Sequence, residues 1–148
     1  MKVFVAKGEN NTWKTTRIRA FSRKLDEFLS SQKDEYKLLS RKYPRLKEET
    51  HGPLVRKYVI ASRTTGKVVR VTIVSEGDSE ASVKKSIQLA EEYNSDIHVM
   101  ASRPKCWNVE WNQKFDVEPL ETTKDRPSPT DIQSMMNGII NAIQQKLM

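Results

Sequence analysis

The stretch VRKYVIASRTTGKVVRVTIVSEGDSEASVKKSIQLAEEYNSDIHVMAS, residues 55–102, decides the fold of this chain. Its first part holds two runs of alternating apolar and polar residues, Val55 to Ala61 and Lys67 to Val74, a pattern typical of half-buried strands. The five residues between the runs end in Gly66, which supplies the positive φ that a short hairpin loop needs. We therefore predict an antiparallel hairpin here.

The second part of the same stretch has the pattern of a helix followed by a strand. Apolar residues recur at helical spacing between residues 83 and 90, and Asp78 or Ser79 precedes them as a helix cap. The apolar run Ile97 to Ala101 then indicates another strand. Two strands joined by a helix normally pair in parallel through a right-handed crossover, so residues 67–102 predict a strand–helix–strand unit.

The N-terminal region adds a strand and helical segments. Val3 to Val5 form a short apolar run that predicts a strand. From Thr16 the apolar residues recur at helical spacing, and the pattern resumes as far as Tyr43 before Pro44 ends it. The pair Ser30-Ser31 is a plausible break, so we expect one bent helix or two.

The C-terminal region predicts a connector and a final helix. Residues 109–117 suggest an irregular pair of strands, and the proline-containing residues 119–130 suggest an extended connector. Thr130 and Gln133 have the spacing of a capping box. The helix that follows, residues 131–148, has a wide apolar stripe made of Ile132, Met135, Met136, Ile139, Ile140, Ile143 and Leu147.

Together these segments predict one α/β (mixed α+β) domain, residues 1–118, with the connector and helix after it. The small mixed sheet contains a β-hairpin and the strand–helix–strand unit, with amphipathic helices packed on it. An exposed stripe as wide as that of the final helix would favour aggregation. The helix is therefore expected to cover the core of its own domain or to form a homodimer with a second copy.

Composition favours a soluble protein of the cytoplasm. The chain has 148 residues, of which 36% are hydrophobic and 30% are charged, and it has one cysteine, Cys106. A lone cysteine cannot form an internal disulfide, which is typical of a reducing compartment. No apolar run reaches the roughly 20 residues of a membrane span, so we expect no membrane association.

Positive charge is concentrated near the N-terminus. Residues 1–60 contain fifteen Lys/Arg against seven Asp/Glu, whereas the remaining residues have no basic excess. Such asymmetry often indicates a nucleic-acid surface, although a solvated helix face explains it about as well. The candidate phosphate contacts are Lys14, Arg17, Arg19, Arg23, Lys24, Arg41, Lys42, Arg45, Arg56, Lys57, Arg63, Lys67 and Arg70.

The hairpin supports part of this candidate set. Its Thr65-Gly66-Lys67 turn followed by an amphipathic helix is similar in outline to small DNA-binding domains in which a sheet faces the major groove. That resemblance implies that five of the basic residues lie on or beside an exposed sheet face. They are Arg56, Lys57, Arg63, Lys67 and Arg70.

A second candidate site is the loop before the helix at residues 83–90. A phosphate group could be bound here by the N-terminal amides of the helix together with Ser75, Ser79 and Ser82. Alternatively, the carboxylates of Glu76 and Asp78 could bind Mg²⁺. The simpler interpretation, which we favour, is an ordinary capped helix beside acidic residues.

The stretch Val71 to Ser102 is also similar to the opening strand–helix–strand of the universal stress protein family. The matching residues are Asp78-Ser79, Ala90-Glu91-Glu92-Tyr93 and Ile97-His98-Val99. In that family the acidic loop helps to bind ATP. The present chain lacks the family's later glycine-rich phosphate loop, so we do not carry the function over.

No catalytic residue, metal ligand or cofactor is assigned. His51 and His98 belong to no common motif, and neither G-x-x-x-x-G-K-[ST] nor G-x-G-x-x-G occurs. Three functions stay open. The first is a non-enzymatic nucleic-acid-binding or accessory protein. The second is a regulator or inhibitor that docks on a protein partner through its helices and exposed aromatic residues. The third is a small nucleotide- or metal-dependent enzyme that uses the loop Ser75–Ser82.

Overall fold

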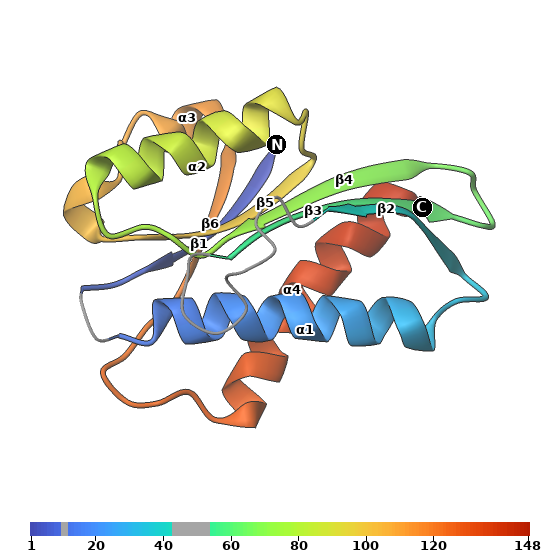
Figure 1. The fold of residues 1–148 in the computed structure, drawn as a ribbon, viewed down its shortest axis with the longest axis horizontal. Coiled ribbons are helices and arrows are strands. Elements are labelled where there is room, and N and C mark those ends of the chain that lie inside the picture. The colour runs from blue at the N-terminus through green and yellow to red at the C-terminus, as the bar shows by residue number, and fades with distance from the viewer. Residues whose placement is uncertain (10–11, 43–53) are drawn as a thin grey trace.

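A computed structural model describes residues 1–9, 12–42 and 54–148, and it shows a six-stranded sheet with helices on both faces (Figure 1). The strands lie in the order β2-β3-β4-β5-β1-β6. In chain order the elements are β1 (Lys2–Lys7), α1 (Lys14–Ser31), β2 (Tyr36–Lys42), β3 (Val55–Ser62), β4 (Val68–Val74), α2 (Glu80–Glu92), β5 (Ile97–Ser102), the 3₁₀ turn η1 (Pro104–Cys106), α3 (Trp111–Lys114), β6 (Asp116–Leu120) and α4 (Pro129–Leu147).

Pairing in the sheet confirms the predicted hairpin and the strand–helix–strand unit. β3 pairs with β4 in antiparallel orientation, and Gly66 in the loop between them has a φ of 76°. β4 pairs in parallel with β5, with Val71 opposite Ile97. β1 lies between β5 and β6 and is parallel to both. The mixed α/β fold expected from the sequence is therefore present.

Two layers of helices cover the sheet, and each packs on its own apolar cluster. α1 and α4 lie on one face, where Phe21, Ile60 and Ile139 belong to the larger cluster (Figure 1). α2 and the segment after β5 lie on the other face, where Val83 and Trp107 belong to the smaller one. β1 lies between the two layers.

The final helix packs on the sheet of its own chain. α4 begins after Ser128, whose side chain accepts a hydrogen bond from the backbone N–H of Asp131 in a capping box. The cap thus lies two residues before the expected Thr130. Met136, Ile139 and Ile143 in the apolar stripe are fully buried. The apolar stripe is covered within the chain, so an exposed stripe no longer supports a homodimer. The homodimer stays a prediction.

Residues 36–42 form a strand rather than the expected continuation of the helix. α1 ends at Ser31, and β2 then pairs with β3 in antiparallel orientation at the edge of the sheet. Tyr36 and Leu38 are half-buried on one side, while Lys37 and Leu39 are exposed. Pairing with β3 satisfies one row of the backbone groups of this segment, and Tyr36 and Leu38 pack on the larger apolar cluster. Together these contacts outweigh the helical spacing of its apolar residues. Tyr43, to which the helical pattern extended, lies outside the described residues.

The strand pair expected over residues 109–117 is also wrong. Trp111 begins the short helix α3, and only β6 follows as a strand. β6 is an edge strand that lies beside β1 as far as Leu120, which shortens the expected connector. Pro119 is tolerated in β6 because an edge strand leaves one row of backbone N–H groups unpaired.

Candidate functional site

Four parallel strands end at one edge of the sheet, which we name the carboxyl edge. β1 ends at Lys7, β4 at Val74, β5 at Ser102 and β6 at Leu120. After β1 the chain enters α1 on one face, and after β5 it enters η1 on the other. In open α/β sheets, ligands bind where neighbouring strands send the chain to opposite faces. The carboxyl edge is therefore the first candidate site.

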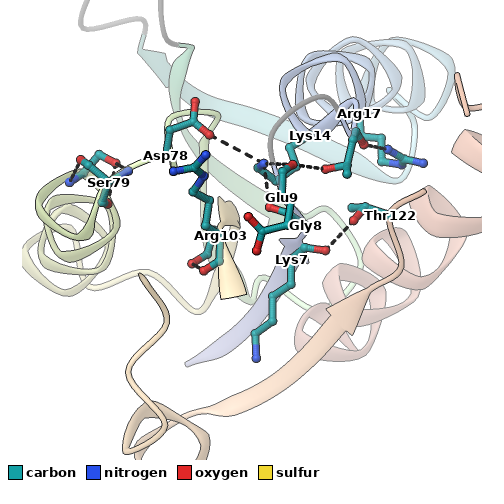
Figure 2. Close-up of polar contacts among 12 residues, drawn as sticks. Lys7, Gly8, Glu9, Lys14, Arg17, Asp78, Ser79, Arg103 and Thr122 are labelled. Atoms are coloured by element: carbon teal, nitrogen blue, oxygen red, sulfur yellow. Dashed lines mark hydrogen bonds and ion pairs between the residues drawn. The ribbon is translucent and has the colours of Figure 1, made fainter. Parts of the chain in front are cut away.

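Lys14 lies at the centre of the carboxyl edge, and its ammonium joins three segments (Figure 2). The residue is only 7% exposed. Its Nζ donates hydrogen bonds of 2.8 Å to the carbonyl oxygens of Gly8 and Glu9, and it lies 3.7 Å from Oδ1 of Asp78. The sequence placed Lys14 among the candidate phosphate contacts and Asp78 in the loop Ser75–Ser82. The structure brings the two side chains together at the carboxyl edge.

Arg17 is buried one turn further along α1. The residue is 2% exposed, and its guanidinium donates a hydrogen bond to the carbonyl oxygen of Thr12. Burial lowers the pKa of this guanidinium, while the carboxylate of Asp131 raises it. Lys14 and Arg17 were expected on an exposed basic face of the helix, and this is wrong because both hold the preceding loop against α1.

The loop Ser75–Ser82 uses its hydroxyl groups for the fold. Ser75 Oγ accepts a hydrogen bond of 2.6 Å from the backbone N–H of Leu54. Ser79 and Ser82 form the capping box of α2. Gly77 has no room for a Cβ, which would collide with the carbonyl oxygen of Ala101 in β5.

These contacts favour the simpler interpretation of the loop as a helix cap. Its exposed carboxylates are Glu76, Asp78 and Glu80, the last in the first turn of α2. Across residues 1–9, 12–42 and 54–148, no three His, Cys, Asp or Glu side chains gather closely enough to hold a metal ion. Asp78 therefore has Lys14, rather than a group of carboxylates, as its charged neighbour.

His98 belongs to a buried hydrogen-bond network between β4, β5 and α2 that the sequence did not reveal. Its Nδ1 lies 2.7 Å from Thr72 Oγ1, and its Nε2 lies 2.9 Å from Ser86 Oγ. Thr72 Oγ1 also lies 2.9 Å from Ser95 Oγ. Complete burial lowers the pKa of His98 to about 3, so the ring is neutral and poorly suited to act as a general base near neutral pH.

A second candidate site lies on the antiparallel part of the sheet. β2, β3 and β4 together contain six Lys/Arg and no Asp/Glu. Residues opposite each other in a ladder share one face. The register places Lys42 opposite Lys57, Arg70 opposite Val59, and Lys37 opposite Ala61. These four cations, Lys37, Lys42, Lys57 and Arg70, occupy the face away from α1, which we name the basic sheet face.

Three of the four cations on the basic sheet face, Lys37, Lys42 and Arg70, are exposed, whereas Lys57 is half-buried and lines a cavity with Glu76 and Glu92. In Figure 1, α2 lies over the parallel half of the sheet, while β2 and the outer parts of β3 and β4 extend beyond it. Val68 on this side is 48% exposed. The ring of Tyr93, just after α2, has Lys57 Nζ 5.0 Å and the Arg70 guanidinium 5.2 Å from its centroid.

The candidate phosphate contacts are therefore spread over several surfaces. Arg41 and Arg56 lie on the face of the sheet that packs against α1. Arg41 donates a hydrogen bond of 3.2 Å to Asp26. Arg56 was expected to be exposed, and it is buried. Arg19, Arg23 and Lys24 lie along α1, Arg63 and Lys67 lie at the tip of the hairpin, and Arg45 lies outside the described residues. Lys37 was missed because its segment was interpreted as helix, which hid the alternation of a strand.

Comparisons with known proteins add no further indication of function. No family model, curated protein or solved structure matches the chain. Among the described residues, no helix combines the length and the apolar character needed to cross a membrane.

Proposed function

We propose that the protein binds nucleic acid through the basic sheet face, with Lys37, Lys42, Lys57 and Arg70 contacting phosphate groups. One observation carries this proposal: three adjacent strands supply these cations without a single carboxylate. Lys and Arg contacts to phosphate give affinity with little sequence selectivity. The function is therefore non-enzymatic binding of a polyanion.

The pairing of like charges supports this choice of partner. Lys42 lies directly opposite Lys57, an arrangement that destabilises a ladder unless an anion lies nearby. A phosphate group would relieve this repulsion. The ring of Tyr93 contacts both Lys57 and Arg70 and thereby holds these two cations near each other.

The test is a salt titration of binding, measured by fluorescence anisotropy with labelled single-stranded and duplex oligonucleotides. Four phosphate contacts predict that log affinity falls with log salt with a slope of about −2.8 for a single strand and about −3.6 for a duplex. The double variant Lys57→Gln/Arg70→Gln should flatten the slope by about two units at most, with little dependence on sequence.

A matched control removes the same charge elsewhere. Lys84 and Lys105 are exposed and lie away from β2 and β3, so Lys84→Gln/Lys105→Gln should leave the slope unchanged. Equal effects of the two double variants, or no binding at low salt, would contradict the proposal. The regulator that docks on a protein partner would then take precedence, with the exposed Leu39 and Val68 as its apolar contacts.

A further inference from the structure

The carboxyl edge contains a cavity that the proposed function does not use. It lies at the start of α1 and has a volume of ≈ 530 Å³. Hydroxyl groups line it from Thr12, Thr15 and Thr16, and charged groups from Lys14, Lys124 and Asp78. This composition is rich in donors and contains one carboxylate.

The buried ammonium of Lys14 has more donors than its hydrogen bonds use. A lysine ammonium has three N–H donors, and two of them bond to the carbonyl oxygens of Gly8 and Glu9. For the third, the described residues offer only Asp78 at 3.7 Å, which is too long for a hydrogen bond. Among the described residues, one N–H of this 7% exposed side chain therefore makes no hydrogen bond, and it lies beside the cavity that Lys14 and its ion-pair partner Asp78 line.

A second donor near Asp78 also has no partner. Arg103 follows β5 and extends toward Asp78 (Figure 2). Its Nε is buried and has no hydrogen-bond partner among the described residues. No side chain among the described residues caps α1, so within this part of the chain the N–H groups of its first turn are also left for an acceptor at this end of the helix. Donors from α1 and from the residue after β5 therefore lie at the carboxyl edge.

The sequence around Lys14 has the spacing of a phosphate-binding loop. Gly8 directly follows the buried parallel strand β1, and after four more residues Trp13 precedes the helix that Lys14 and Thr15 begin. The loop G-x-x-x-x-G-K-[ST] places its lysine and hydroxyl in the same way, after a strand and before a helix. Trp13 stands in place of the second glycine, and its φ of 60° lies in the left-handed region that glycine usually occupies.

We propose that this cavity binds the phosphate group of a small molecule. Lys14 and the first-turn N–H groups of α1 donate to its oxygens, and the hydroxyl of Thr15 lies beside it. Asp78 competes with the anion for the same ammonium and thereby limits affinity. The shared chemistry is a phosphate group, supplied either by free phosphate or by the phosphate chain of a nucleotide. The site is independent of the basic sheet face, because the two share no residue.

Isothermal titration calorimetry of the full chain with inorganic phosphate, pyrophosphate and adenosine triphosphate tests the site. Each active ligand should bind saturably with one site per chain. Asp78→Asn removes the competing carboxylate and should tighten binding about fivefold, as expected for one charge close to an anion near the protein surface. Its matched control is Glu110→Gln, an exposed carboxylate outside the cavity, which should leave affinity unchanged.

Removing a hydrogen-bond donor from the cavity should weaken phosphate binding. Lys14→Gln should weaken binding at least tenfold, and Thr15→Ala tests the same cavity without removing a buried charge if Lys14→Gln fails to fold. Pyrophosphate or adenosine triphosphate binding tighter than phosphate identifies a phosphate chain as the ligand, and equal affinities identify a single phosphate group.

Three results would overturn the proposal: no saturable binding at millimolar ligand, an affinity that Asp78→Asn does not raise, or an affinity that neither Lys14→Gln nor Thr15→Ala lowers. Lys57→Gln/Arg70→Gln should retain phosphate affinity within twofold. The proposal for the cavity and the proposal for the basic sheet face can therefore be tested and rejected independently.

Discussion

Lys14 and Arg17 differ from Arg23 in the side of α1 that they occupy. Residues three or four apart share one side of a helix. Ile18 follows Lys14 by four positions, and Phe21 follows Arg17 by four, and both are fully buried in the core. The two basic residues therefore lie on the apolar stripe. This spacing is present in the sequence, and it shows why a count of charges overestimates the cations available at the surface.

His98 should make stability depend on pH. Its folded pKa of about 3 is below its ordinary value of 6.5, and its hydrogen-bond partners are hydroxyl groups. Between these pH values the unfolded chain binds a proton that the folded chain does not. Stability from this residue is thus complete above pH 6.5 and falls by roughly 1 kcal/mol per pH unit as pH decreases toward 3.

Urea unfolding of the wild type and of His98→Gln between pH 4 and 8 measures this effect. The variant should be less stable at pH 7, because the network loses a partner, but its free energy of unfolding should change less with pH. Parallel pH profiles for the two proteins would show that other groups cause the acid dependence.

The first turn of α4 tests where the helix begins. The Ser128 side chain accepts from the backbone N–H of Asp131, so Ser128→Ala should cost about 1 kcal/mol of unfolding free energy. Thr130 is exposed and caps nothing, so Thr130→Ala should change stability by less than about 0.5 kcal/mol. Chemical denaturation of both variants decides between the caps, and a larger loss for Thr130→Ala would favour the position expected from the sequence.

Elements with strong local patterns could be predicted from the sequence, and elements that depend on distant partners could not. The alternation of residues 55–74 and the helical spacing of residues 83–90 were enough for β3, β4 and α2. β2 and β6 are edge strands whose identity depends on their neighbours β3 and β1. The ion pair of Lys14 with Asp78 joins two segments that meet only because their strands end at one edge, which no local pattern contains.

At the scale of the whole molecule, α4 should be essential for folding. It supplies Ile132, Met136, Ile139, Ile143 and Leu147 to the larger apolar cluster. A chain that ends at Pro127 should therefore lose cooperative thermal unfolding, measured by circular dichroism. If this truncated chain folds instead, and light scattering shows that a full-length dimer becomes a monomer, then α4 is an interface element.

The central position of β1 has a consequence for the order in which the chain folds. Lys2 lies opposite Ile97 on one side and Asp116 on the other, so the first strand of the chain has no ladder partner until most of the chain is available. The meander of β2, β3 and β4 pairs strands that are close in sequence and can form early. Closure of long loops slows folding. We therefore expect β1 to insert late between β5 and β6, and its apolar residues to stay exposed during synthesis until both partner strands are available.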